Sequence, residues 1–149
     1  MKQQLHPRVG VGAFILNERN ELLLVLRKKA PEKGHWSLPG GKVEWMETVE
    51  DTVVREIQEE VGLEIEIISL LCVTNHILSE EDAHWICPTY IAKVKNGRAE
   101  NLEKHAIDEI GWFSLECLPS PLALTLQNAL KEYKKSGTGI FNPVNALRI

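Results

Sequence analysis

Three glutamates, Glu56, Glu59 and Glu60, lie within one predicted helical turn that ends just before Gly62. At about 100° per residue their side chains share one side of the helix, beside its apolar stripe. Like charges at these spacings cost about 0.2–0.5 kcal/mol per pair, and an anion near a helix C-terminus costs a further ~0.3–1 kcal/mol. A solvated acidic face explains this placement poorly. Mg²⁺, which binds carboxylate oxygens, would turn the repulsion into ligation, so the turn predicts a metal site.

The segment "PGG" at residues 39–41 precedes this helix. Glycine lets a backbone approach another group without interference from a Cβ atom, and a glycine carbonyl can then serve as an oxygen ligand. Taken alone, the segment indicates an ordinary turn. Together with the three glutamates it strengthens the prediction of a metal site.

In its residue types and in their spacing, the segment 41–63 resembles the Nudix box. The defining positions are occupied by Gly41, Glu47, Arg55-Glu56-Ile57, Glu59-Glu60 and Gly62-Leu63. The flanking stretches "HWSLPGG" and "DEIGWFSLECLP" are also similar to the family. Met46 stands where many relatives have glycine, and Thr52 and Val53 stand where small residues are frequent. These departures concern loop shape and helix packing and leave the ligand positions intact.

The resemblance implies hydrolysis of a nucleoside diphosphate linked to another moiety, with Mg²⁺ as cofactor and Mn²⁺ as a substitute. It assigns Glu56 and Glu60 as the principal metal ligands, Glu59 as a further ligand and the Gly40 carbonyl as a fourth. We expect Glu47 and Arg55 to form an orienting pair, with Arg55 also steering a glutamate.

The general base is open between Glu56, acting through a bound water, and an acid outside the box. Glu103 and Glu109 are the outside candidates, each of which is equally read as a solvated loop charge. Arg27 resembles a phosphate-contacting position, with a surface ion pair as the alternative. Candidates for lining a base pocket by stacking are Trp36, Trp85, His76 and His84, with core packing or loop exposure as the alternative for each.

Periodicity and turn residues place these candidates on a series of elements. We expect strands at 8–16 and 21–27, an extended piece at 36–38, a helix at 48–61, a strand at 63–74, a polar loop at 75–84, a strand at 85–94, a loop at 95–109, a strand at 110–119 and a helix at 122–135. Pro88 implies a sheet edge or a bulge. The pattern predicts an α+β domain, and the resemblance implies the Nudix fold, an α/β/α sandwich with a mixed sheet. We expect a single domain over 1–149, with the tail 136–149 unassigned.

Composition bounds the function classes. The 149 residues are 44% hydrophobic and 26% charged, and the net charge of −4 indicates no broad basic surface for duplex nucleic acid. Three cysteines without CxxC spacing argue against a disulfide framework or a zinc site and favour a reducing cytosol. No apolar run approaches the ~20 residues of a membrane span, and the N-terminus lacks an apolar signal segment. We expect a cytoplasmic protein.

The expected substrate is a nucleoside or deoxynucleoside triphosphate, cut to a monophosphate and pyrophosphate. ADP-ribose and other NDP-linked metabolites are alternatives. The first predicted strand begins almost at once, so we expect no N-terminal subdomain, and the chain resembles the compact MutT-like triphosphatases. A non-catalytic nucleotide-sensing module is the alternative of another class, but such modules are expected to have damaged boxes. Homodimers are frequent in the family.

Overall fold

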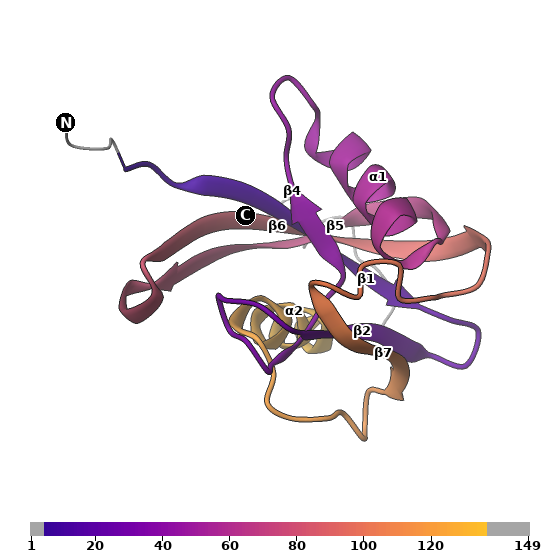
Figure 1. Ribbon diagram of the computed structural model, residues 1–149. Coiled ribbons are helices and arrows are strands. Elements are labelled where there is room, and N and C mark those ends of the chain that lie inside the picture. The colour runs from indigo at the N-terminus through magenta and orange to yellow at the C-terminus, as the bar shows by residue number, and fades with distance from the viewer. Residues whose placement is uncertain (1–4, 137–149) are drawn as a thin grey trace.

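A single mixed sheet lies between two helices (Figure 1). The computed structural model describes residues 5–136. The tail 136–149, for which the sequence predicts no element, lies outside the described residues except for Ser136. The helices are α1 (Val49–Val61) and α2 (Leu124–Lys135). The strands are β1 (Arg8–Leu16), β2 (Glu21–Arg27), β3 (Trp36–Ser37), β4 (Gly40–Lys42), β5 (Glu64–Leu78), β6 (Ala83–Asn96) and β7 (Ile107–Ser114). This is the expected α/β/α sandwich.

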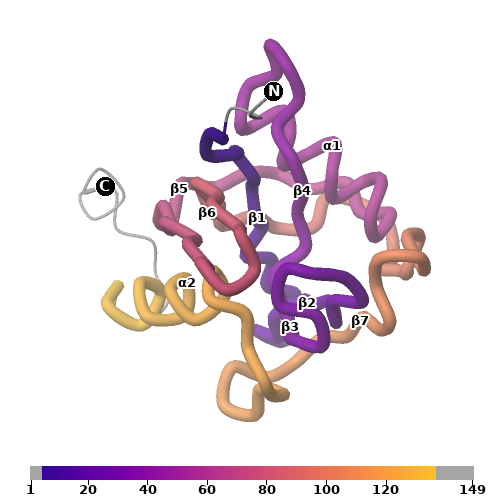
Figure 2. The backbone as a smooth tube through the Cα atoms, turned by 60° about the vertical axis from the view of Figure 1, so that its left-hand side comes forward, coloured from indigo at the N-terminus to yellow at the C-terminus, as the bar shows by residue number. Residues whose placement is uncertain are grey.

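The strand order is β3-β2-β1-β6-β5, with β4 also bonded to β1 and β7 to β2. β1 and β6 are parallel, and the other pairs are antiparallel. β1 meets β2 at Leu16↔Leu22 and bonds β4 over Gly10–Gly12. Figure 2 shows α1 and α2 on opposite sides of these strands. β4 is therefore bonded to the N-terminal half of β1, and the loop that leads into α1 follows from there.

Both faces of the central strands are buried, which explains their nearly continuous apolar runs. On β1, Ala13 and Ile15 pack in the cluster with α1, whereas Phe14 packs in the cluster with α2. β2 alternates in the same way, with Leu23 on the α1 side and Leu24 on the α2 side. The period of two along each strand places successive residues on opposite faces.

The segment 75–84 is not the polar loop that we expected. β5 continues to Leu78 and β6 begins at Ala83, joined by the short 3₁₀ helix η1 (Ser79–Glu81). The inward positions of this ribbon are polar, since Thr74 and His76 are buried while Ile77 is 57% exposed. A polar segment of this kind is typical of a loop in sequence, so the sequence predicts the two strands but not their extension into residues 75–84.

Pro88 does not mark a sheet edge, because β6 lies between β1 and β5. The pairing of β1 with β6 is interrupted between Val9↔Ile86 and Gly12↔Thr89, and Pro88 falls in this gap. β7 also begins earlier than predicted, at Ile107, and ends at Ser114. Within residues 5–136 no helix is long and apolar enough to span a membrane.

Candidate active site

α1 begins and ends at residues suited to those positions. Thr48 caps its N-terminus by accepting a hydrogen bond from the Asp51 backbone N–H at 3.1 Å. Gly62 ends it at a φ of +74°, a left-handed conformation that favours glycine. Of the predicted apolar stripe, Val53, Ile57 and Val61 are fully buried, but Val54 is 37% exposed. The last turn carries no basic residue, so the acidic side chains there lack a compensating charge in their own turn.

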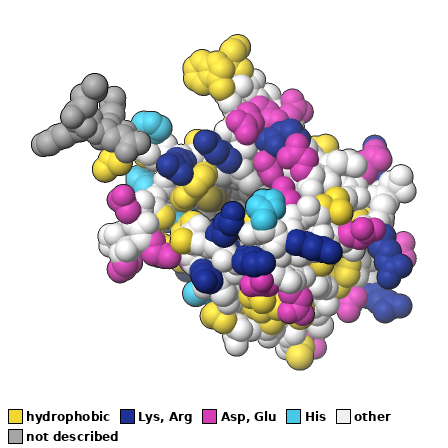
Figure 3. Space-filling model, in the orientation of Figure 1, with side chains coloured by type: hydrophobic (Ala, Val, Ile, Leu, Met, Phe, Trp, Pro, Cys, Tyr) yellow, Lys and Arg dark blue, Asp and Glu magenta, His cyan; other side chains and the backbone are white. Residues whose placement is uncertain are grey.

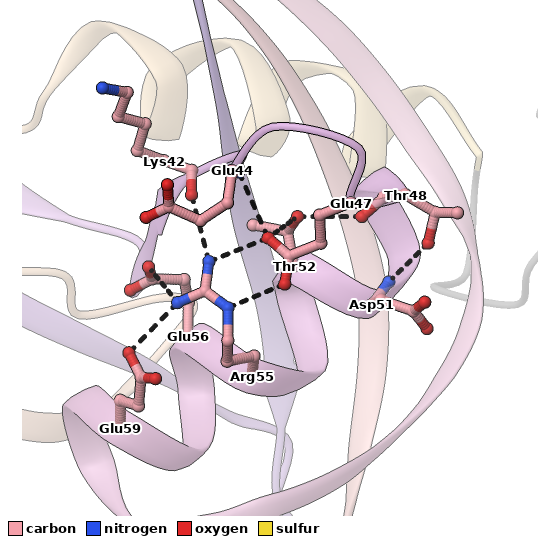
Figure 4. Close-up of polar contacts among 9 residues, drawn as sticks. All are labelled: Lys42, Glu44, Glu47, Thr48, Asp51, Thr52, Arg55, Glu56 and Glu59. Atoms are coloured by element: carbon pink, nitrogen blue, oxygen red, sulfur yellow. Dashed lines mark hydrogen bonds and ion pairs between the residues drawn. The ribbon is translucent and has the colours of Figure 1, made fainter.

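Arg55 connects the acidic side chains of the box (Figure 4). Its Nε and Nη2 atoms donate to the two carboxylate oxygens of Glu47, at 2.7 and 2.9 Å. Its Nη1 atom donates to Glu56 at 2.9 Å and to Glu59 at 3.1 Å. The hydrogen bond from Arg55 lowers the pKa of Glu47 to about 2, and Glu47 in turn raises the pKa of Arg55. The geometry is that of the expected orienting pair, and both partners are charged at neutral pH.

Thr52 holds Glu47 from the other side. Its hydroxyl donates to Glu47 Oε1 at 2.7 Å, and the residue is fully buried. Thr52 is one of the departures from the family pattern, so this contact was not predicted; the only signal in the sequence is a hydroxyl in the first turn of the helix. The bidentate bond from Arg55 and the bond from Thr52 together fix the orientation of the Glu47 carboxylate.

The two glycines of β4 are required by close contacts within the protein. A Cβ atom on Gly41 would lie 2.2 Å from Cδ of Glu56, so the Glu56 side chain passes directly over this residue. A Cβ atom on Gly40 would lie 1.9 Å from the carbonyl oxygen of Val11 on β1. The expected close approach at "PGG" is therefore made by Glu56 and by β1. Ligation by the Gly40 carbonyl stays a prediction.

Glu56, Glu59 and Glu103 form a cluster in which each residue offers a carboxylate oxygen within 4.8 Å of the others. Glu103 comes from the loop between β6 and β7, where its carbonyl accepts from the backbone N–H groups of Ala106 and Ile107. Three convergent carboxylates are suitable oxygen ligands for a hard divalent cation, so the residues fit the implied Mg²⁺. Glu109, the other candidate outside the box, is exposed on β7 opposite Leu26 and is not in this cluster.

Glu60 is the most buried carboxylate of the box, with 8% of the residue exposed. Its Oε1 accepts from the Gly40 backbone N–H at 3.2 Å. Burial, with a smaller effect from the charges of Glu103 and Glu56, raises the pKa of Glu60 to about 8, and the hydrogen bond from Gly40 opposes this shift. Burial also raises the pKa of Glu56. Glu60 lies outside the cluster of three, and its role as a principal ligand stays a prediction.

A cavity of about 330 Å³ adjoins these residues. Gly40, Gly41 and Glu60 line it, together with Arg27, whose charge acts on Glu60. Arg27 Nε also donates to the Pro31 carbonyl at 2.6 Å. On the face in Figure 3, basic side chains gather around a hollow beside a group of acidic side chains over α1. Arg27 lines this cavity, and its contact with a phosphate stays a prediction.

The structure corrects the expectation for Trp36. This residue is 8% exposed and packs in the core on the α2 side, with its ring centroid 5.0 Å from that of Phe113 in an edge-on arrangement. It is not among the residues that line the cavity, whereas Trp85 of β6 is. Core packing, the alternative for Trp36, is what the structure has.

Comparisons with known proteins show the family and the fold of this chain. The model of the NUDIX domain family matches residues 6–134. The ADP-ribose pyrophosphatase of Methanocaldococcus jannaschii is 38% identical over 91% of this chain and 78% of its own length. The 8-oxo-dGDP phosphatase of Mus musculus is 33% identical over 75% of this chain, which spans 34% of that relative's length. The MutT NUDIX hydrolase of Burkholderia pseudomallei has a TM-score of 0.82 and 44% identity, covering 86% of this chain and 98% of the solved one.

The fold and the carboxylate helix define a Nudix domain, and the chain belongs to the NUDIX family. It is a Nudix hydrolase, an enzyme that acts on phosphoanhydride bonds.

Proposed function

We propose that this enzyme is a Mg²⁺-dependent pyrophosphohydrolase that cleaves nucleoside or deoxynucleoside triphosphates, including modified ones, to a monophosphate and pyrophosphate. The observation that carries the proposal is the cluster of Glu56, Glu59 and Glu103, next to a cavity lined by Arg27 and by Gly41, which Glu56 contacts. A triphosphate brings about four negative charges, and its hydrolysis needs both cation binding and basic side chains.

Each residue of the site has a definite task in this proposal. Glu56, Glu59 and Glu103 would hold the cation, with Glu60 and the Gly40 carbonyl as further ligands. The cation, when bound, neutralises phosphate oxygens and acidifies water. Arg55 holds one oxygen each of Glu56 and Glu59, which orients the free oxygens of both carboxylates.

The proton of the attacking water has two candidate acceptors, Glu56 and Glu103. Both offer a carboxylate oxygen to the cluster, so the choice between them stays open. Arg27 contacts a phosphate group of the substrate. Lys29 and Lys42 also line the cavity and attract the polyphosphate.

Cleavage of ADP-ribose is the second candidate function. It is supported by the name of the Methanocaldococcus jannaschii relative, which matches most of this chain. The name of the mouse relative, an 8-oxo-dGDP phosphatase, supports a purine nucleotide with a free phosphate chain instead.

A side-by-side measurement of kcat/KM decides between the two. The panel contains the eight common NTPs and dNTPs, a few oxidised or methylated ones, and ADP-ribose, each with Mg²⁺ and with products identified by chromatography. We expect a triphosphate to lead and to yield a monophosphate and pyrophosphate. An ADP-ribose value tenfold above every triphosphate would replace the first function by the second.

We further propose that the whole chain acts as one catalytic domain in the cytoplasm, on a small-molecule nucleotide, and as a homodimer. Cys72, Cys87 and Cys117 are all free thiols, which fits a reducing compartment. Light scattering of the purified protein tests the homodimer.

A further inference from the structure

A pair of polar side chains outside the Nudix box, Glu32 and His76, also lines the cavity. Glu32 lies in the loop between β2 and β3, and His76 lies on β5. His76 Nε2 is 2.6 Å from Glu32 Oε1. The His76 side chain is 6% exposed and that of Glu32 is 12% exposed, and both line the cavity. The small exposed part of each side chain therefore faces this cavity.

Glu32 is held in place by several elements. Its Oε2 accepts from the Leu124 backbone N–H at 2.8 Å, at the start of α2, where the N-cap residue Ala123 makes no side-chain cap of its own. Its backbone N–H donates to Glu81 Oε2 at 3.1 Å. Glu32 adopts a φ of +59°, which is uncommon for a residue with a Cβ atom. The carboxylate is thus preorganised on the α2 side of the cavity.

This part of the cavity offers hydrogen-bond acceptors. A carboxylate has about four acceptor positions, and His76 and Leu124 occupy two of those on Glu32. Since Glu32 accepts from Nε2, the neutral His76 ring has its lone pair on Nδ1. That atom is buried and has no hydrogen-bond partner within residues 5–136. Because Nδ1 is buried, the acceptor positions that remain for a ligand are those of Glu32, and a matching ligand presents donors to this carboxylate.

The walls around the pair suit a flat apolar group. Trp85, Leu38 and Gly10 line the cavity, and a Cβ atom on Gly10 would lie 3.3 Å from the Trp85 ring. The Arg8 guanidinium lies 5.6 Å from the centroid of that ring. The volume of about 330 Å³ is near the lower limit for small-molecule sites, about 300–1,000 Å³. A nucleobase beside Trp85 fits these dimensions.

Resting on the proposed function, we infer that Glu32 reads the nucleobase of the substrate and that this base is guanine or a guanine derivative. Guanine is the common base with two adjacent donors, N1–H and the 2-amino group, which match the two oxygens of a carboxylate. Adenine and cytosine place an acceptor next to their amino group, and uracil and thymine flank one N–H with two carbonyl oxygens. Each of these would direct a lone pair at Glu32. His76 is a positioning residue that acts through Glu32.

The test is calorimetric binding of GMP, IMP and AMP to the full chain without divalent metal, so that no hydrolysis occurs. IMP differs from GMP only by the missing 2-amino group. We expect GMP to bind at least tenfold more tightly than IMP and AMP, because a site built for a donor rejects an analogue that lacks it. Equal binding of the three nucleotides would overturn the inference. Failure of the proposed function appears separately, as absence of triphosphate hydrolysis with Mg²⁺.

Glu32→Gln tests the residue itself. The amide keeps an acceptor for the Leu124 N–H but presents a donor in place of the second oxygen, so the GMP preference over AMP should fall at least tenfold. Glu80→Gln is the matched control: it removes a charge from an exposed residue of η1 that does not line this cavity, and it should keep the preference. An unchanged preference in Glu32→Gln would contradict the inference. Where that variant fails to fold, the comparison of GMP with IMP on the parent chain decides.

Discussion

Glu60 shows how far the environment of a single side chain changes its chemistry. Burial holds the pKa of this carboxyl at about 8, against an ordinary value of 4.5. Near neutral pH without metal, the group therefore retains a proton that an exposed glutamate has lost. A divalent cation favours the ionised form, so metal binding and proton release are coupled at this residue.

The first prediction follows from the sign of this shift. Between pH 4.5 and about 8 the folded chain binds a proton at Glu60 that the unfolded chain has lost, so the free energy of unfolding falls as pH rises through this window. Urea unfolding with EDTA at several pH values measures the slope. We expect Glu60→Gln to flatten the slope relative to the parent. Identical slopes in both proteins would show that Glu60 is not the titrating group.

The same residue scale carries a prediction on activity. Glu56→Gln and Glu60→Gln should each lower kcat at least a hundredfold, about 2.7 kcal/mol, because each removes an anionic oxygen from the metal site. Neither should melt below the parent without metal near neutral pH, because Glu56→Gln removes an anion near the C-terminus of α1 and Glu60→Gln replaces a carboxyl group that is already protonated there. Glu116→Gln, which changes an exposed acid after β7, is the control and should keep full activity. Melting well below the parent would make these acids structural.

At the scale of elements, β4 joins the sheet to the active site. The strand bonds β1 at Gly12↔Gly40, and its next residue, Gly41, lies under the Glu56 side chain. One strand of three residues therefore fixes both the position of the loop into α1 and the path of a metal ligand.

Replacing the two glycines separates these roles. In Gly40→Ala the new Cβ atom meets the backbone of Val11, which cannot move without shifting β1, so we expect a loss of about 1–3 kcal/mol of stability. In Gly41→Ala it meets the flexible side chain of Glu56, so kcat should fall at least tenfold while stability stays within about 1 kcal/mol of the parent. Thermal melts and initial rates measure both effects. Equal stability losses would refute the distinction.

Elements with local signals could be predicted, and those that depend on distant contacts could not. α1 was placed within one residue because its cap, its apolar period and Gly62 are adjacent in sequence. Strands at 63–74 and 85–94 could be predicted, but their extension through 75–84 could not, because the inward residues Thr74 and His76 are polar. The contact of His76 with Glu32 joins residues 44 apart and has no local signature. Glu103 was recognised as a candidate, but its place beside Glu56 depends on how the loop between β6 and β7 folds back.

For the whole molecule, charge is arranged by region. The chain has a net charge of −4, yet Arg27, Lys29 and Lys42 line the cavity that adjoins the acidic cluster of α1. A polyphosphate can interact with both regions. Some of its oxygens bind the cation that the acidic side chains hold, and others contact the basic side chains along the cavity. Neither region alone would hold such a substrate in a defined orientation.

The most direct test of the metal-dependent mechanism is the hydrolysis of a nucleoside triphosphate in the presence of Mg²⁺, of Mn²⁺ or of excess EDTA. Chromatography identifies the products. We expect a nucleoside monophosphate and pyrophosphate with either cation, no turnover in EDTA, and recovery when Mg²⁺ is restored, since the clustered carboxylates act on the substrate through the cation. Full hydrolysis in excess EDTA would contradict this account of the site.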